Sequence, residues 1–469
     1  MSRRPLSRRT FLNSSLRSST AVIAAGAAVQ NLSGTKAAEA LETTSKNDRP
    51  RLALIGAGGQ GTGDAKLAAK FADFVAIADA DLSNAERGKA ALGGKADIYQ
   101  DYRKLLERDD IDAVINGTPD HWHTSVCVDT CRAGKDIYTE KPMTLTIDEG
   151  KIMRQVVKET GRVVQVGTQQ RSSKFFQTAV ELVRNGRIGQ LKQVWVALPY
   201  FTTKGGPYPA TAVPKSLNWN LYQGQAPVNP YCVERTHANF RWWYEYAGGI
   251  ITDWGNHHVD IAHWGMDCEQ TGPLSIDARA LFPNPKGDQY YNTPDRFFAK
   301  LLFPTGVELL YFSSLDERLR FGIVEDHQET TSEQVAWLFG KDVPEEIKSY
   351  NRNGIMFIGD QGRVFCNRGG VYGKPVDALK ENPLPADAWS VRPSTDHMGN
   401  FIECVKTREE PVSPVRIQQR TITTCHLTNI SLRLGRPLKW DPETEQIVGD
   451  DEAAGWLKRE QRKPFEVHA

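Results

Sequence analysis

Two polar residues in the segment GGIITDWGNHHVDIAHW, residues 248–264, have types and spacing suited to moving a proton. Asp253 and His257 are four residues apart, so they share one face of the chain if the segment is helical. An imidazole has an unperturbed pKa of about 6.5 and exchanges a proton near neutral pH. From the same face, the carboxylate of Asp253 could orient the imidazole or bind a substrate hydroxyl. The pair is therefore a candidate for acid–base chemistry.

A glycine pattern earlier in the chain predicts a dinucleotide site. Gly56, Gly58 and Gly61 follow the apolar run RLALI and precede a helical pattern. In that setting the glycines allow a tight turn and close approach of the backbone to a pyrophosphate at a helix N-terminus. Asp79 follows about 20 residues later, where it can accept hydrogen bonds from ribose hydroxyls and repel a 2′-phosphate. The pattern predicts NAD, with NADP less favoured; the alternative is that Asp79 is a solvated residue at a strand end.

These motifs need a sheet to position them, and the apolar runs supply one. Buried strands without polar alternation, each followed by a helix, are typical of a parallel doubly wound sheet. Five such strands are predicted, at 51–58, 73–81, 111–119, 135–142 and 162–169. Helices are predicted at 64–72 and 124–133. Later runs with turn residues between them predict strands of a second sheet at 300–314 and 354–366.

Three further motifs give the chain a resemblance to a known family. They are TPDHWH at 118–123, TEKPMT at 139–144, and a DxGxHxxD pattern formed by Asp253, Gly255, His257 and Asp260. In this order after the glycine turn, they resemble the Gfo/Idh/MocA oxidoreductases over nearly the whole chain that follows the leader. The resemblance implies an α/β fold in two domains. A Rossmann domain with a doubly wound parallel sheet would span 41–170, and an α+β substrate and oligomerisation domain with a large, mostly antiparallel sheet would span 171–469.

By matching motif positions, the resemblance makes Lys141, Asp253 and His257 the catalytic set. Moving a hydride between a sugar carbinol and a nicotinamide ring requires a group that takes the hydroxyl proton as the C–H bond breaks. His257 is the expected proton shuttle, and Lys141 at a strand end would stabilise a developing alkoxide. His121 and His123 would line the nicotinamide end, with ordinary loop packing as the alternative. The expected cofactor site is Gly56, Gly58, Gly61, Asp79, Thr118, Pro119, His123, Glu140 and Lys141.

Aromatic and basic residues just before the catalytic motif favour a carbohydrate substrate. Aromatic faces cover the apolar C–H faces of sugar rings, and an arginine donates to hydroxyls or to a carboxylate. The aromatic rings of 238–249 could instead form an interdomain core, and Arg171 could make a plain salt bridge. The long aromatic loop 205–246 departs from the family pattern, so the sugar or polyol stays unidentified. The expected substrate residues are Arg171, Arg241, Trp243 and His258.

Composition argues against several partners. The chain has 58 basic and 57 acidic residues, which disfavours nucleic acid or anionic lipid as a partner, and a membrane span is not expected. Its seven scattered cysteines form no CxxC pair, so buried free thiols are expected. One predicted helix carries several side chains of types that bind metals. They do not complete a recognised set of ligands, so no metal is expected. That helix carries His257, His258, Asp260 and His263. A homo-oligomer, dimer or tetramer, is expected through the outer face of the second sheet.

The first 40 residues are typical of a Tat export signal. Arg8 and Arg9 precede Phe-Leu, a short apolar run at 21–29 and an Ala-x-Ala sequence that ends at Ala40. The apolar run is shorter than the roughly 20 residues that span a bilayer. The expected location is therefore the periplasm or the exterior, whether the leader is cleaved or retained. Because Tat export carries folded proteins, NAD would be loaded inside the cell and carried out.

Three functions fit these observations. The first is an NAD(P)-dependent oxidoreductase that transfers a hydride between a tightly held nicotinamide and a sugar or polyol. The second is an NAD-dependent glycoside hydrolase or lyase that oxidises a sugar hydroxyl transiently. The third is a sugar-binding protein with a vestigial cofactor site, and the intact Lys141 and His257 argue against it. Between the first two the residues do not decide.

Overall fold

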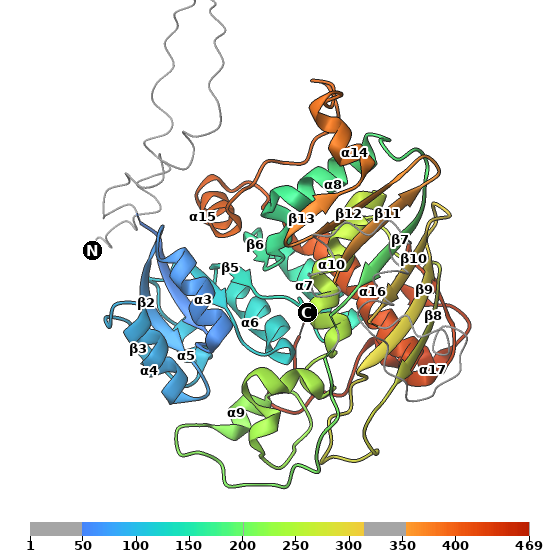
Figure 1. The fold of residues 1–469 in the computed structure, drawn as a ribbon. Coiled ribbons are helices and arrows are strands. Elements are labelled where there is room, and N and C mark those ends of the chain that lie inside the picture. Colours follow the sequence, from blue (N-terminus) through green and yellow to red (C-terminus); the bar gives the residue numbers. More distant parts are fainter. Residues whose placement is uncertain (1–48, 200, 314–352, 469) are drawn as a thin grey trace, which may run out of the picture. The chain divides into compact units, whose positions relative to one another are not determined.

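The structure is a computed structural model of the chain, and it describes residues 49–199, 201–313 and 353–468. The leader, with Arg8, Arg9 and Ala40, lies outside the described residues. Two sheets organise the described part (Figure 1). Among these residues, no helix combines the length and the apolar character that crossing a bilayer requires.

The first sheet has six parallel strands in the order β3-β2-β1-β4-β5-β6, the order of a doubly wound dinucleotide-binding sheet. All five predicted strands are confirmed. Strand β3 was not predicted, because its three residues are too few to show a pattern. The first helix begins at Gly59, five residues before the predicted start at residue 64. The elements are β1 (Arg51–Ile55), α3 (Gly59–Ala68), β2 (Asp73–Ala78), α4 (Leu82–Ala91), β3 (Asp97–Tyr99), α5 (Tyr102–Leu106), β4 (Ala113–Asn116), α6 (Asp120–Arg132), β5 (Asp136–Thr139), α7 (Ile147–Thr160) and β6 (Val164–Val166).

Strand β1 shows why its sequence is continuously apolar. Successive side chains of a strand point to opposite faces of the sheet. Leu52 and Leu54 pack in one cluster with residues of α3 and α4, whereas Ala53 and Ile55 pack in the other with residues of α5 and α6. Both faces are covered, so neither can carry polar side chains.

The second sheet has nine strands in the order β13-β12-β11-β7-β10-β9-β8-β14-β15. Strands β10 and β7 are parallel and the other pairs are antiparallel, as expected for the second domain. The two predicted apolar regions form the hairpins β9–β10 and β11–β12. The strands are β7 (Leu191–Ala197), β8 (Ser275–Leu281), β9 (Arg296–Leu302), β10 (Glu308–Phe312), β11 (Gly354–Gly359), β12 (Arg363–Asn367), β13 (Gly370–Tyr372), β14 (Leu438–Asp441) and β15 (Gln446–Ile447).

In Figure 1, α8, α10 and α16 lie beside the second sheet, whereas α9 and α14 lie at the bottom and the top of the view. Helices α10 and α16 pack against each other, and α10 also packs against β7 and β11. The helices are α8 (Lys174–Arg184), α9 (Trp219–Gln223), α10 (Ile250–Met266), α14 (Lys374–Asp377), α15 (His397–Thr407), α16 (Val415–Leu434) and α17 (Asp451–Ala454). Helix α10 carries Asp253 and His257 on one face, as their spacing predicted.

One helix from late in the chain completes the core of the first sheet. Phe401 and Ile402 of α15 are fully buried in the same cluster as Leu52 and Leu54 of β1. Arg408, just after α15, pairs with Asp136 at the start of β5. The core of the first sheet therefore depends on side chains far outside residues 41–170.

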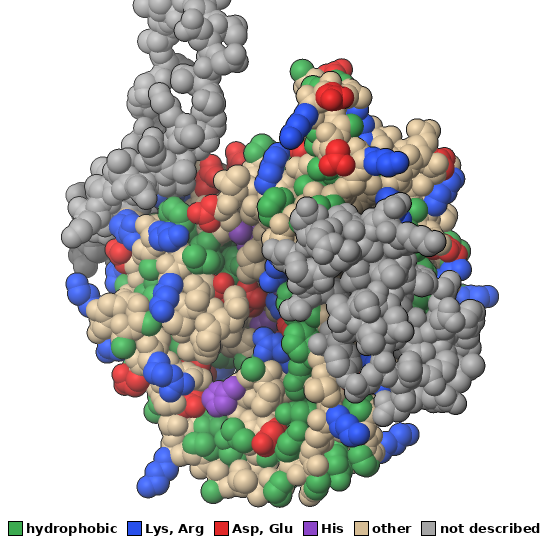
Figure 2. All heavy atoms as spheres, in the orientation of Figure 1, with side chains coloured by type: hydrophobic (Ala, Val, Ile, Leu, Met, Phe, Trp, Pro, Cys, Tyr) green, Lys and Arg blue, Asp and Glu red, His purple; other side chains and the backbone are tan. Residues whose placement is uncertain are grey.

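The seven cysteines are all buried and free, which confirms the prediction from their spacing. Charged side chains of both signs are interspersed on the face shown in Figure 2 and form no single basic patch there. That distribution agrees with the near-neutral composition.

Candidate active site

A cavity of about 980 Å³ lies where the carboxyl ends of the first sheet meet α10. Doubly wound sheets bind their ligands at this edge. The two ends of the cavity have different linings. The part that we name the glycine end is lined by Gly56, Gly58, Asp79, Asn84 and Arg87. The part that we name the lysine end is lined by Lys141, Arg241, Asp253, His257 and Arg368.

The glycine turn connects β1 to α3 and leaves space beside its backbone. Gly56 has a φ of +83°, and a Cβ on Gly61 would lie 2.0 Å from the Gly56 carbonyl oxygen. A Cβ on Gly58 would meet no protein atom within 4 Å, so the cavity beside it is open. A pyrophosphate needs this combination of a close turn, open space and the start of a helix. The residues present fit a dinucleotide.

Asp79 lies at the end of β2, where the sequence predicted a ribose contact. Its two carboxylate oxygens accept hydrogen bonds from the backbone N–H groups of Ala57 and Asp81, each at 2.8 Å. Burial raises the pKa of Asp79 to about 6, against the lowering effect of these hydrogen bonds. At neutral pH the group is mainly ionised and is held in one orientation at the cavity wall, which favours ribose hydroxyls over a 2′-phosphate.

At the lysine end, Lys141 and Asp253 form a partly buried ion pair. The Lys141 Nζ donates to Asp253 Oδ1 at 2.6 Å and to the Asp253 carbonyl oxygen at 3.1 Å. Arg241 Nε lies 3.2 Å from the same Oδ1. Burial alone would raise the pKa of Asp253, but the charges of Lys141 and Arg241 lower it to about 2. Asp253 is thus ionised and positions the ammonium group, which keeps a third N–H for a ligand.

His257 lies one turn after Asp253 on α10 and is 5 % exposed. Burial and the charges of Lys141 and Arg368 lower the pKa of His257 well below its usual value, so the ring is neutral. Its Nδ1 has no hydrogen-bond partner within the described ranges. Asp253 therefore binds Lys141 and not the imidazole, and His257 reaches the cavity as an unpaired neutral ring.

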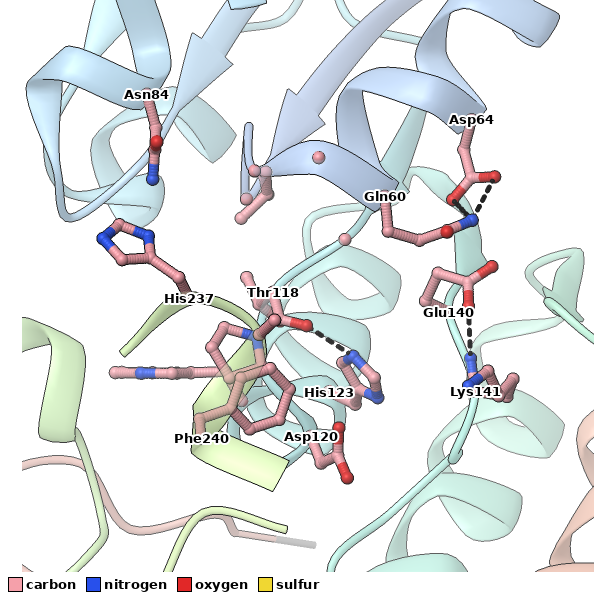
Figure 3. Close-up of a pocket in the computed structure, with 18 of the residues that line it drawn as sticks. Gln60, Asp64, Asn84, Thr118, Asp120, His123, Glu140, Lys141, His237 and Phe240 are labelled. Carbon is pink, nitrogen blue, oxygen red and sulfur yellow. Dashed lines mark hydrogen bonds between the residues drawn. The ribbon is translucent and has the colours of Figure 1, made fainter. Parts of the chain in front are cut away.

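Three buried carboxyl groups also line the cavity, and the sequence reading found only Glu140. Asp64 is hydrogen-bonded to Glu140, and burial together with the Glu140 charge raises the pKa of Asp64 to about 9. Burial raises the pKa of Asp120 to about 8, and its Oδ2 has no partner among the described residues. Figure 3 shows Asp64 and Glu140 along one wall beside Lys141. Asp64 and Asp120 are mainly protonated at neutral pH and can donate a hydrogen bond.

The remaining cofactor residues from the sequence also reach the cavity wall. Thr118, Pro119 and His123 line it, and the ring nitrogens of His123 lie 2.8 Å from the Thr118 carbonyl oxygen and 2.6 Å from that of Pro142. His123 thus connects the loops that follow β4 and β5 (Figure 3). His121 is fully buried 2.8 Å from the Tyr222 carbonyl oxygen, in the loop packing that was its alternative.

Of the four expected substrate residues, Arg241 lines the cavity and Arg171 does not. Arg171 is 3 % exposed and donates to both carboxylate oxygens of Asp260 at 2.7 and 2.8 Å. Glu269 pairs with it at 2.8 Å. Arg171 therefore forms a structural salt bridge and does not contact the cavity. With Asp260 so engaged, the described residues contain no group of three or more His, Cys, Asp or Glu placed to bind a metal.

Trp243 and His258 are also packed away from the cavity. Trp243 is fully buried, with the Arg235 guanidinium 3.8 Å from its ring and Tyr291 in edge contact. It belongs to an aromatic core, so this ring of segment 238–249 packs inside the protein and does not cover a sugar. His258 is fully buried as well, with Nδ1 3.3 Å from the Gln170 side chain.

The long aromatic loop 205–246, which we name the strap, runs along the cavity from one end to the other. Its Leu217, Leu221 and Phe240 line the wall. Near the glycine end, Leu82 N donates to the Ser216 carbonyl and Asn218 N to the Ala80 carbonyl, both at 2.9 Å. Trp122 Nε1 of α6 donates to the Tyr222 carbonyl at 2.9 Å. The strap is thus attached to the first domain at the loop after β2 and at α6.

Comparison with known proteins agrees with this geometry. Residues 50–168 match the NAD-binding Rossmann-fold domain of the Gfo/Idh/MocA oxidoreductase family, and residues 191–288 and 380–467 match its C-terminal alpha/beta domain. The chain is 29 % identical over 243 residues to scyllo-inositol 2-dehydrogenase (NAD(+)) of Bacillus subtilis, covering 51 % of this chain and 60 % of that protein. It is 35 % identical over 160 residues to a glycosyl hydrolase family 109 protein of Shewanella, covering 30 % and 35 %. The matches thus span less than two thirds of these relatives.

Among solved structures, the WlbA dehydrogenase of Bordetella pertussis, in complex with NADH and UDP-GlcNAcA, superposes with a TM-score of 0.56 at 18 % identity. The match covers 84 % of this chain and 99 % of that one. At such low identity the likeness concerns the fold, which here is a six-stranded parallel sheet followed by a large mixed sheet. With both family domains matched in order, the chain belongs to the Gfo/Idh/MocA family of oxidoreductases.

Proposed function

We propose that this protein is an NAD-dependent oxidoreductase acting on a CH–OH group of a sugar or polyol, and that it keeps its cofactor between turnovers. One observation carries the proposal: the Lys141–Asp253 pair lies in the same cavity as the glycine turn and Asp79. Oxidation of an alcohol beside a dinucleotide requires a charge that stabilises the developing alkoxide and a group that takes the hydroxyl proton, and Lys141 with the neighbouring His257 can supply both. The inositol dehydrogenase relative agrees with this substrate class.

Each residue at the lysine end has a distinct part in this chemistry. When bound, the nicotinamide ring supplies the acceptor or donor of the hydride. Lys141 uses its free N–H to bind the reacting oxygen and stabilise the charge that develops there. His257 is neutral and has an unpaired ring nitrogen, so it can take the hydroxyl proton. Asp253 positions Lys141 and stays ionised throughout.

The strap supports cofactor retention. It contributes wall residues at both ends and is hydrogen-bonded to the loop after β2 and to α6. Release of a dinucleotide would require these contacts to open, which slows exchange. A retained cofactor must be regenerated in place, by passing the hydride to a second substrate or by returning it to the first.

Export through the Tat pathway belongs to the same proposal, because a folded protein can carry its cofactor out of the cell. The order of Arg8, Arg9, the apolar run and Ala40 supports it. Changing both arginines to lysine should leave the precursor in the cytoplasm, measured by fractionation and immunoblotting. A matched pair of changes at Arg3 and Arg4 should leave export intact. Equal export of both variants would contradict the proposal.

A second function is favoured by the family 109 glycosyl hydrolase relatives. In that chemistry a ring hydroxyl is oxidised, the neighbouring C–H becomes acidic, the leaving group is eliminated, water adds, and the hydride returns to the sugar. The net reaction is hydrolysis, with no net change in the cofactor. The groups at the lysine end serve this sequence equally well, because its first step is the same oxidation.

The deciding experiment extracts nucleotide from the protein under denaturing conditions and then incubates native protein with sugars, polyols and glycosides without added NAD. We expect about one NAD(H) per chain, and either an oxidised product paired with a reduced one or a cleaved glycoside. The Lys141→Met variant is the control and should retain nucleotide without turnover. Protein that emerges empty and needs stoichiometric NAD would overturn cofactor retention, and no turnover in either format would overturn the oxidoreductase assignment.

A further inference from the structure

One cation at the lysine end is not explained by the proposed chemistry. Arg368 lies between β12 and β13 and lines the cavity close enough to His257 for its charge to act on that ring. The centre of its guanidinium is 4.5 Å from the centroid of the Trp254 ring, and Nε is 3.2 Å from the side-chain amide of Gln170. These two contacts fix the plane of the group.

Arg368 differs from the other cations of this end in having no anion. Lys141 and Arg241 share Asp253, at 2.6 and 3.2 Å. Arg368 forms no ion pair with any residue that the structure describes, and its terminal nitrogens donate to no acceptor there. Asp253 and Glu140 act on it only at longer range. Arg368 is exposed and lines the cavity wall, and among the described residues its two terminal nitrogens have no acceptor.

An oriented guanidinium next to an indole ring matches a definite ligand chemistry. Its parallel N–H groups bind the two oxygens of a carboxylate, and such charge-assisted pairs are stronger than neutral hydrogen bonds. A phosphate is usually held by several cations or by a run of backbone N–H groups, and Arg368 is the one cation of the lysine end that has no ion-pair partner in the described ranges. A sugar ring bound at Lys141 and His257 would bring a carboxylate on a neighbouring carbon toward this group.

We infer that Arg368 binds a carboxylate of the substrate, so that the substrates are sugar acids, such as uronic acids or glycosides of them, in preference to neutral sugars. This inference rests on the proposed function, because it names the substrate class of the same cavity. Gln170 and Trp254 act as positioning residues that hold the guanidinium.

The test compares binding of paired ligands to the NAD-loaded protein by calorimetry: glucuronate against glucose, galacturonate against galactose, and glucose 6-phosphate as a different anion. We expect the acid of at least one pair to bind ten or more times more tightly than its neutral partner. Arg368→Gln should abolish that preference, Arg368→Lys should keep part of it, and Arg132→Gln, at an exposed position on α6, should change nothing. No preference in any pair, the same preference in Arg368→Gln, or a stronger preference for the phosphate would overturn the inference.

Turnover separates this inference from the proposed function. Reduction of the bound nucleotide by neutral and acidic sugars alike, unchanged in Arg368→Gln, would leave an oxidoreductase and overturn the carboxylate site. Binding of acids through Arg368, with no reduction of nucleotide and no cleavage of any glycoside, would support the carboxylate site and overturn the proposed function.

Discussion

At the glycine end of the cavity the protein offers backbone atoms and open space, whereas at the lysine end it offers titratable side chains. Asp79, the one carboxylate predicted for the ribose, has both oxygens held by backbone N–H groups. At the other end, Asp253 is held by the side chains of Lys141 and Arg241, and His257 keeps an unpaired nitrogen. The carboxylate at the glycine end thus already has its hydrogen-bond partners within the protein.

The difference separates binding from reaction. A satisfied, fixed surface loses little conformational freedom when a ligand arrives, so it suits a cofactor that stays. Unpaired buried groups are costly to fold around and gain partners only when a substrate enters. We therefore expect changes at the lysine end to alter rates and changes at the glycine end to alter occupancy.

The largest effect should follow from removing a proton-handling group at the lysine end. Lys141→Met or His257→Ala should slow hydride transfer by about 10²-fold or more, the usual loss for a positioned acid or base. Bound NAD should remain near one per chain, since the glycine end is untouched. Single-turnover absorbance of the reduced nucleotide checks the rate, and near-native turnover in both variants would place the chemistry elsewhere.

Two alanine substitutions should distinguish the glycine that leaves space for the cofactor, Gly58, from the glycine that packs against the turn, Gly61. At Gly58 a Cβ meets no protein atom, so Gly58→Ala should keep its melting temperature and lose NAD affinity by about tenfold, since each 1.4 kcal/mol is tenfold. At Gly61 a Cβ would lie 2.0 Å from a carbonyl oxygen, so Gly61→Ala should lower stability by about 1–3 kcal/mol. Calorimetry and thermal melting separate the two, and identical behaviour of both variants would contradict the assignment.

Asp79 should set the choice between dinucleotides. Asp79→Ser removes the charge that opposes a 2′-phosphate, so the preference for NAD over NADP should fall on the order of tenfold, the change that relief of about 1.4 kcal/mol of like-charge repulsion produces. Turnover should change little with saturating NAD. Equal binding of both dinucleotides by the unaltered protein would show that Asp79 does not face the ribose.

The smallest effect concerns stability and pH. Asp120 has a folded-state pKa of about 8, and an unfolded Asp titrates near 3.9. Between these values the folded chain keeps a proton that the unfolded chain has lost, so the free energy of unfolding falls as pH rises. Asp120→Asn removes this loss, and its stability relative to the unaltered protein should rise from pH 5 to pH 6 by about 1 kcal/mol, because one pH unit between the two pKa values changes the free energy of unfolding by up to about 1.36 kcal/mol. Urea unfolding at both pH values checks it; a constant difference would mean that Asp120 is ionised when folded.

The two ends of the cavity also differ in how much of each could be predicted from the sequence. The glycine end is local: a turn, a strand end and a spacing of about 20 residues predict it without tertiary information. The lysine end joins Lys141 and Asp253 across 112 residues, and only the resemblance brought them together. Arg368 has no motif around it. The sequence also predicted substrate contacts that the structure does not form, at Arg171, Trp243 and His258. A residue type alone does not tell whether its partner is a ligand or a buried neighbour such as Asp260.

The place of α15 has a consequence for how the chain is made. Phe401 and Ile402 fill the core of the first sheet, so the strands of residues 51–166 emerge from the ribosome long before their last packing partner. At about 5–20 residues per second, that interval is on the order of tens of seconds. During it the face of β1 that carries Leu52 and Leu54 lacks its full cover, so the nascent chain exposes apolar side chains that the finished protein buries. A cofactor domain cut at residue 170 for expression or grafting would stay in that unfinished state.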